Sequence, residues 1–268
     1  MKIKFYLVDS FTDEAFKGNP AGVCILHEKI SEELMQNIAM EVNAAETAFV
    51  EKTGEGKYSI RYFSPMVEIA FCGHATVASA KVLFEKFNCE ETEFETYSGL
   101  KLSAYKHGEK IKVIFPLFGT VPYSSQGLLD ALNISSCEDL RYCDEKLGVI
   151  LRVKDKETLL SIKPDFEKLK SAASEYRGVS VTAKSDDAEY DFYSRYFAPA
   201  VGINEDPVTG SAHSMLARYW GDILGKKEMK AYQLSKRGGY LNLKITGENS
   251  IEVICNAKIT IEGELSFQ

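Results

Sequence analysis

A nine-residue segment that occurs twice constrains the fold of this chain more than any other feature. Arg61-Tyr-Phe-Ser-Pro-Met-Val-Glu-Ile69 and Arg195-Tyr-Phe-Ala-Pro-Ala-Val-Gly-Ile203 agree at six of nine positions. The copies begin 134 residues apart, which is half of the 268-residue chain. A repeat of this kind predicts two related folding units rather than one continuous domain.

A glycine that opens an apolar segment follows each copy. Gly73-His-Ala75 follows the first copy, and Gly210-Ser-Ala212 follows the second when three extra residues are allowed. The apolar spacing that comes next predicts helices over 73–87 and 210–224. The repeated unit is therefore a strand, a proline-containing loop and a helix that starts at glycine.

Stretches with alternating apolar residues, rich in β-branched and aromatic side chains, make up much of the remaining sequence. They predict strands over 2–8, 47–51, 58–63, 92–97, 100–106, 110–115, 147–153, 179–183, 191–197, 229–234, 240–246, 250–256 and 258–264. Further helices are predicted over 31–42, 124–132 and 165–175. Hairpin-like strands mixed with isolated helices favour an α+β fold over a doubly wound one.

The domain prediction follows from the repeat and from a proline-rich stretch over 115–122. We expect two pseudo-symmetric domains, residues 1–118 and 119–268, each a curled, mostly antiparallel sheet around a central helix. The last strand is free to pack back on the first domain.

Composition and charge exclude several classes of protein. With 45% apolar and 26% charged residues the chain is neither disordered nor fibrous. A net charge of −7 offers no attraction to a polyanion, so we expect no nucleic-acid partner. The start lacks the apolar core of a signal peptide, and the longest uncharged stretch, 113–129, contains two prolines. We expect a cytoplasmic protein without a membrane partner.

The cysteines and histidines suggest no metal centre by their spacing. The six cysteines form no C-x-x-C pair, and the four histidines are scattered. Such a pattern predicts neither a zinc site nor a disulfide scaffold.

The two helix starts are the predicted ligand sites. A helix N-terminus carries a partial positive charge and unpaired N–H groups, which suit a carboxylate or an oxyanion. Gly73 and Gly210 would let a substrate approach that backbone closely. If the domains pack with pseudo-twofold symmetry, converging N–H donors would stabilise charge that develops when a proton is removed next to a carboxylate.

Few acid or base groups lie near these segments. Glu46, between the helix 31–42 and a strand and among small residues, is the first choice for a catalytic base. His74 and Asp206 complete the predicted catalytic set, and Cys72 and Ser211 are predicted to bind substrate. The ordinary structural alternatives are a solvated Glu46, a capping His74, a turn-forming Asp206 and a buried apolar Cys72.

Several motifs together resemble one family. They are Asp9-Ser-Phe-Thr, Gly18-Asn-Pro-Ala-Gly-Val23, Asn43-x-x-Glu-Thr-Ala-Phe-Val50, Cys72-Gly-His-Ala-Thr76, Glu205-Asp-Pro-Val-Thr-Gly-Ser-Ala-His213 and Gln233 with Arg237-Gly-Gly239. In this order they span essentially the whole chain and resemble the PhzF-like phenazine biosynthesis family, whose fold is similar to that of diaminopimelate epimerase.

The resemblance implies a cofactor-independent isomerase, usually a homodimer, that acts on a small carboxylate-bearing substrate. Glu46 matches the glutamate that moves the proton. His74, Asp206 and Ser211 match residues that hold or protonate the substrate. Gly73 and Gly210 match the backbone donors.

One departure keeps two alternatives open. Epimerases and racemases of the wider superfamily carry a cysteine before each Gly-led helix, whereas here only Cys72 is present and Thr209 precedes Gly210. The first alternative is a two-base epimerase or racemase that uses Cys72. The second is a protein that binds a small anion without catalysis.

Overall fold

The computed structural model describes residues 1–143 and 147–267 and divides into two compact units. Unit 1 comprises residues 1–115 and the C-terminal segment from Glu252, and unit 2 comprises residues 116–251. The division falls where the proline-rich stretch begins, and the chain returns to unit 1 within β17 (Ser250–Cys255). Within the described parts of the chain, no helix has both the length and the apolar character needed to cross a membrane.

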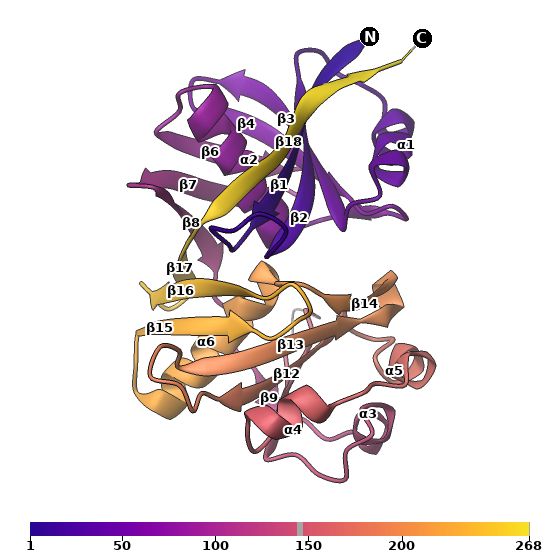
Figure 1. Cartoon of the computed structure of the whole chain (residues 1–268), viewed down its shortest axis with the longest axis vertical. Coiled ribbons are helices and arrows are strands. Elements are labelled where there is room, and N and C mark those ends of the chain that lie inside the picture. The colour runs from indigo at the N-terminus through magenta and orange to yellow at the C-terminus, as the bar shows by residue number, and fades with distance from the viewer. Residues whose placement is uncertain (144–146, 268) are drawn as a thin grey trace. The chain divides into compact units, whose positions relative to one another are not determined.

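Unit 1 is built on a mixed sheet. Its strands are β1 (Lys2–Ser10), β2 (Asn19–Leu26), β3 (Glu46–Gly54), β4 (Lys57–Phe63), β5 (Glu68–Ile69), β6 (Glu91–Thr96), β7 (Lys101–His107), β8 (Lys110–Pro116) and β18 (Ala257–Ser266). The order of pairing is β18, β1, β2, β3, β4, β6, β7, β8, with the β2–β3 and β4–β6 pairs parallel and the others antiparallel. Because β18 runs along β1, the two chain ends lie side by side (Figure 1).

Helix α2 (Gly73–Lys86) is the centre of unit 1. It packs against β1, β2, β3, β7 and β18 and is buried along nearly its whole length. Its sequence is rich in Ala, Ser, Thr and Val, whose small side chains let the sheet curl closely around it. The other helix, α1 (Glu32–Val42), covers β3 and β4 behind an N-cap in which Ser31 Oγ accepts from Leu34 N at 3.2 Å.

Unit 2 repeats this order of pairing. Its strands are β9 (Val121–Pro122), β10 (Asp139–Tyr142), β11 (Val149–Arg152), β12 (Val179–Lys184), β13 (Phe192–Ala198), β14 (Ile203–Asp206), β15 (Glu228–Gln233) and β16 (Gly239–Ile245). The series β10, β11, β12, β13, β15, β16 alternates antiparallel and parallel pairs as the series β1, β2, β3, β4, β6, β7 does in unit 1.

Helix α6 (Gly210–Leu224) occupies the position of α2 in this order and packs against β15 and β16. Its Trp220 is fully buried, stacks on Phe192 with ring centroids 5.6 Å apart, and donates to Thr182 Oγ1 at 2.9 Å. The described part of the unit also contains three short helices, α3 (Gln126–Ala131), α4 (Lys156–Ser161) and α5 (Phe166–Ala172), and one 3₁₀ helix, η1 (Pro199–Val201).

The α+β fold with a curled sheet around a central helix is confirmed, and both central helices begin at the predicted glycines. The strands β2, β5, β9, β10 and β14 and the helix α4 were not predicted. Strand β2 shows the reason. Its residues are buried on both faces, so the alternation that reveals a half-buried strand is absent.

Candidate active site

Three predicted site residues lie in contact in unit 1. Glu46 is the first residue of β3, Cys72 is the N-cap of α2, and His74 is in the first turn of that helix. His74 Nε2 lies 3.1 Å from Glu46 Oε2, and Cys72 Sγ lies 3.5 Å from His74 Nδ1. All three are at most 4% exposed. The glutamate is thus not on a solvated surface, where most glutamates are found.

Residues at the adjoining ends of β1 and β2 hold His74 in place. Asn19 Nδ2 lies 3.2 Å from His74 Nδ1, and Ser10 Oγ donates to the His74 carbonyl at 2.8 Å. Gly18 makes the loop between them possible because it has φ +62° and a Cβ there would lie 2.1 Å from the Ser10 carbonyl oxygen. No role was predicted for Asn19, although the residue lies in the motif Gly18–Val23. Its contact with His74, 55 residues later in the chain, has no local sequence signal.

Burial and neighbouring charge act on His74 in opposite directions. Burial lowers its pKa, but the charges of Cys72 and Glu46 and their hydrogen bonds raise it, and the net pKa lies well above the ordinary 6.5. The raised pKa favours the protonated imidazole, which lies beside the Glu46 carboxylate. Such a pair can store and deliver one proton in a site that excludes water.

The start of α2 is braced from within unit 1. Thr76 Oγ1 donates to the Cys72 carbonyl at 2.7 Å, and the Tyr62 hydroxyl lies 2.7 Å from Thr76 Oγ1. The side chain of Cys72 does not cap the helix. The helix start at Gly73 therefore has no side-chain cap from Cys72, and the expected anion site at its N–H groups stays a prediction.

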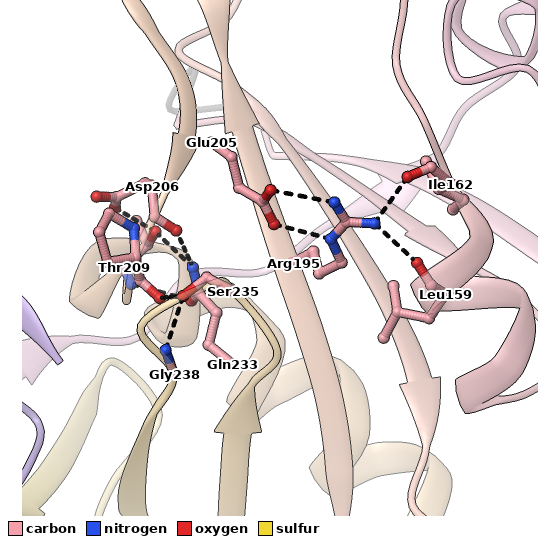
Figure 2. Close-up of polar contacts among 10 residues, drawn as sticks. Leu159, Ile162, Arg195, Glu205, Asp206, Thr209, Gln233, Ser235 and Gly238 are labelled. Atoms are coloured by element: carbon pink, nitrogen blue, oxygen red, sulfur yellow. Dashed lines mark hydrogen bonds and ion pairs between the residues drawn. The ribbon is translucent and has the colours of Figure 1, made fainter. Parts of the chain in front are cut away.

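In unit 2 a loop held by Gln233 leads into α6 (Figure 2). Thr209 Oγ1 donates to Asp206 Oδ2, while Gln233 Oε1 accepts from Thr209 N at 3.0 Å. Gln233 Nε2 donates to the Asp206 carbonyl at 2.8 Å. The carboxylate of Asp206 is thereby held at Thr209, the N-cap residue of α6. Gln233 had no predicted role, because its partners belong to another strand and loop.

A turn after β15 supports the same loop. Ser235 Oγ donates to the Pro207 carbonyl at 2.7 Å and accepts from Gly238 N at 3.0 Å (Figure 2). Gly238 has φ +66° and a Cβ there would lie 2.3 Å from the Tyr232 hydroxyl. The motif Arg237-Gly-Gly239 thus has a structural role in unit 2.

His213 braces the start of α6 as Thr76 braces that of α2. Its Nδ1 donates to the Thr209 carbonyl at 2.8 Å, and its ring stacks on Phe192. Among the described residues, Nε2 has no hydrogen-bond partner. Burial lowers the pKa of His213 to about 4, although its bond to Thr209 opposes that shift. His213 is therefore a neutral core residue at physiological pH.

The repeated arginine makes an equivalent contact in each unit. Arg61 donates to both carboxylate oxygens of Glu68, at 2.7 and 2.6 Å, and Arg195 donates to both of Glu205, at 2.8 and 3.1 Å. Arg195 also donates to the carbonyls of Leu159 and Ile162 (Figure 2). Each two-pronged arginine–glutamate contact holds the short strand that precedes a central helix, β5 in unit 1 and β14 in unit 2.

The predicted site residues thus fall into two groups. Glu46, Cys72 and His74 are in mutual contact at the Gly73 start of α2 in unit 1. Asp206 and Ser211 adjoin the Gly210 start of α6 in unit 2. The first group contains a buried carboxylate beside an imidazole, and the second contains a carboxylate held by Thr209.

Known proteins are similar to this chain over nearly its full length. The model of a family described as phenazine biosynthesis-like protein, PhzC-PhzF, matches residues 8–264. An uncharacterized isomerase of Halalkalibacterium halodurans is 43% identical over 91% of this chain and 92% of that protein.

Solved structures show the same fold. A PhzF-family phenazine biosynthesis protein of Enterococcus faecalis has a TM-score of 0.89 and 40% identity, with all of both chains covered. A predicted epimerase of Pseudomonas aeruginosa, 17% identical, shares the fold with a TM-score of 0.78 over 99% of this chain and all of that one. These similarities support the expectation that the chain is an isomerase.

Proposed function

Because the chain belongs to the PhzC-PhzF family of phenazine biosynthesis-like proteins, we propose that it is a cofactor-independent isomerase that shifts a proton within a small carboxylate-bearing substrate. The observation that carries the proposal is the buried contact between Glu46 and His74, with 3.1 Å between Oε2 and Nε2. A carboxylate buried beside an imidazole can take a proton from carbon and return it.

In the proposed reaction Glu46 removes a proton from a carbon of the substrate. The electron pair of that C–H bond moves into the conjugated system, and the protonated Glu46 returns the proton to another carbon, so that atoms and charge balance. His74 holds the carboxylate in place through its proton. The N–H groups at Gly73 bind the negative charge that develops, because they are oriented before the reaction begins.

In unit 2 we assign substrate contacts to Gly210 and Ser211, and acid–base assistance to Asp206. The support is the loop geometry, in which Asp206 is buried and held by Thr209 at the helix start. Thr209 stands before Gly210, where epimerases of the wider superfamily carry their second cysteine, and its hydroxyl donates to Asp206.

An epimerase or racemase that uses Cys72 is the second candidate function. It is favoured by the short distance from Cys72 Sγ to His74 Nδ1, 3.5 Å, because a protonated imidazole beside a thiol stabilises the thiolate. The absence of a cysteine before Gly210 counts against a symmetrical two-thiol mechanism.

We further propose that the two units arose by internal duplication, and that the protein is a cytoplasmic homodimer. The shared order of strand pairing and the Arg61–Glu68 and Arg195–Glu205 forks support the duplication. The dimer rests on the family resemblance alone.

The test is solvent exchange in deuterated water with a panel of dihydroanthranilates and amino acids. We expect deuterium to enter at least one compound with the wild-type protein and the rate to fall by about 10²- to 10⁴-fold in Glu46→Gln. Glu51→Gln, on the same strand and outside the contact with His74, is the matched control.

The outcomes separate the three functions. Full activity in Glu46→Gln would refute the proposed base. Loss in Cys72→Ala with little change in Glu46→Gln would favour the racemase. Binding of a compound without any exchange would favour a protein that only binds a small anion.

A further inference from the structure

Two loops leave the sheet of unit 1 at the edge where Glu46 lies. The first comprises residues 11–18 and connects β1 to β2. Its ends pair as Ser10 with Asn19, and Ala21 of β2 pairs with Glu46 of the next strand. Neighbouring strands lie about 4.8 Å apart and residues rise about 3.3 Å along a strand, so the loop ends within about 10 Å of the Glu46 backbone.

The second loop leaves the same edge on the other side of β3. Thr47 pairs with Phe63, the last residue of β4, so the register continued by one residue brings Ser64 beside Glu46. Residues 64–67 then connect β4 to β5, the short strand that precedes α2. Glu46 therefore lies between the ends of the two loops.

These loops carry the two most exposed large apolar side chains among the residues that the structure describes. Phe16 is 77% exposed and Met66 is 70% exposed, and the neighbouring Val67 is 55% exposed. A single exposed apolar residue is common on a protein surface and needs no explanation. Here the residues stand on both sides of one buried carboxylate. We call Phe16, Met66 and Val67 the rim.

Hydrogen bonds fix both loops with the rim side chains outward. Phe16 N donates to Oδ2 of the buried Asp9 at 2.7 Å. This charge-assisted bond holds Phe16 at φ +69°, a left-handed conformation that is uncommon for a bulky residue. In the second loop Ser64 Oγ accepts from Met66 N at 3.1 Å and from Val67 N at 3.0 Å. The rim therefore has a defined position.

The rim and the buried site suit different parts of one molecule. Glu46 and His74 serve the reacting carbon, and the N–H groups at Gly73 are expected to hold a carboxylate. The rim offers apolar surface without charge, which favours contact with another apolar group. A ligand that reaches from Gly73 to the rim therefore has an apolar body beyond its carboxylate.

The size of the rim favours a small ligand over a protein partner. A specific protein interface buries about 800 Å² on each partner and uses about 20–30 residues a side. The rim consists of three residues on two loops of unit 1. Such a surface matches the apolar part of a substrate.

We propose that Phe16, Met66 and Val67 are specificity-determining residues that contact the apolar body of a carboxylate substrate. The assignment rests on the proposed function, which assigns the substrate to Glu46 and Gly73. It predicts that the site prefers carboxylates with an apolar body over small polar carboxylates.

Binding to the full chain is measured by calorimetry with two probes, anthranilate and acetate. Both carry one carboxylate, but only anthranilate has an apolar ring. We expect anthranilate to bind at least about tenfold more tightly, because its ring leaves water on binding. Phe16→Ser and Met66→Ser should each weaken anthranilate binding about 3- to 10-fold, whereas acetate binding should stay within about twofold.

Controls separate contact with the ligand from an effect on folding. The rim side chains are exposed, so both serine variants should unfold in urea like the wild type. Tyr97→Ser is the matched control, because Tyr97 is also exposed in unit 1 but lies in the turn between β6 and β7. It should change neither affinity. For any compound that exchanges deuterium, the rim variants should raise KM with little change in kcat.

Equal affinities of the wild type for anthranilate and acetate would overturn the proposal, as would unchanged anthranilate affinity in both serine variants. A changed oligomeric state of the variants with intact anthranilate affinity would assign the rim to a second copy of the chain and would also overturn it. Rim-dependent binding without exchange of any compound would support the rim and refute the isomerase. Exchange that depends on Glu46 but not on the rim would refute the rim alone.

Discussion

Replacement of His213 by threonine should change the pH dependence of stability in a calculable way. His213 is buried in unit 2, its pKa lies at about 4, and that of an unfolded chain lies near 6.5. The introduced hydroxyl would keep a donor toward the Thr209 carbonyl, as Thr76 does toward Cys72, but would not titrate. The variant therefore removes the titrating imidazole but keeps a hydrogen bond to Thr209, so a difference in pH dependence reports the protonation of His213.

The sign follows from the lowered pKa. Above pH 6.5 the His213 imidazole is neutral in both the folded and the unfolded chain, so protonation does not reduce the stability of the fold. As the pH falls from 6.5 toward 4, the unfolded chain binds a proton that the folded chain does not, and stability is lost. One pKa unit corresponds to about 1.4 kcal/mol, so the loss is about 2 kcal/mol at pH 5 and approaches roughly 3 kcal/mol at pH 4.

The other buried histidine does not obscure this window. The pKa of His74 is raised, so below pH 6.5 its imidazole is protonated in both the folded and the unfolded chain. The stability that His74 contributes is lost as the pH rises above 6.5 toward the pKa of His74 in the folded chain. Because the wild type and His213→Thr both contain His74, its contribution cancels in the difference between them.

The assay is urea unfolding of the wild type and of His213→Thr at pH 7, 6, 5 and 4.5. We expect the wild type to lose about 2 kcal/mol more than the variant between pH 7 and pH 5. His107→Gln, which removes an exposed imidazole, is the control and should follow the wild type. Parallel curves for wild type and His213→Thr would refute the assignment of a neutral, buried His213.

Three further predictions concern positions that hold the site. Gly18→Ala should lower the free energy of unfolding in urea by about 2 kcal/mol or more, because its Cβ would meet the Ser10 carbonyl. The control Gly99→Ala, also at positive φ but with open space around the Cβ, should lower it by about 1 kcal/mol. Equal losses in the two variants would contradict the clash at Gly18. Arg195→Lys should destabilise the fold by about 1–3 kcal/mol, since its guanidinium also donates to two carbonyls. Arg61→Lys should cost less, because the Arg61 side chain is 26% exposed whereas that of Arg195 is 12% exposed. The reverse order in thermal unfolding would be inconsistent with the bonding described. Gln233→Leu should destabilise by about 1–3 kcal/mol in urea unfolding, because it leaves Thr209 N without its acceptor and the Asp206 carbonyl without its donor. If Asp206 assists the reaction, the variant should also lower kcat more than it raises KM, and unchanged stability would contradict the hydrogen bonds described.

Much of the fold could be predicted because its signals are local. Helices that begin at Gly73 and Gly210 are visible in the apolar spacing, and half-buried strands such as β7 and β16 show the expected alternation. The repeated Arg-Tyr-Phe segment marks β4 and β13 directly. Strand β2 was missed since it is buried on both faces, and β5, β9 and β14 are too short to show a period.

The sequence by itself determined the repeat, the fold class and which residue types stand at the two helix starts. The tertiary structure decided which of them touch. Parallel pairing of β2 with β3 brings Glu46 to Ala21, close to Asn19, and α2 carries Cys72 and His74 to the same place. Such contacts join residues 25 to 55 positions apart, and they depend on strand order and burial, which no local pattern records. The raised pKa of His74 and the lowered pKa of His213 follow from that burial and its neighbours, so two histidines at similar helix positions differ in charge.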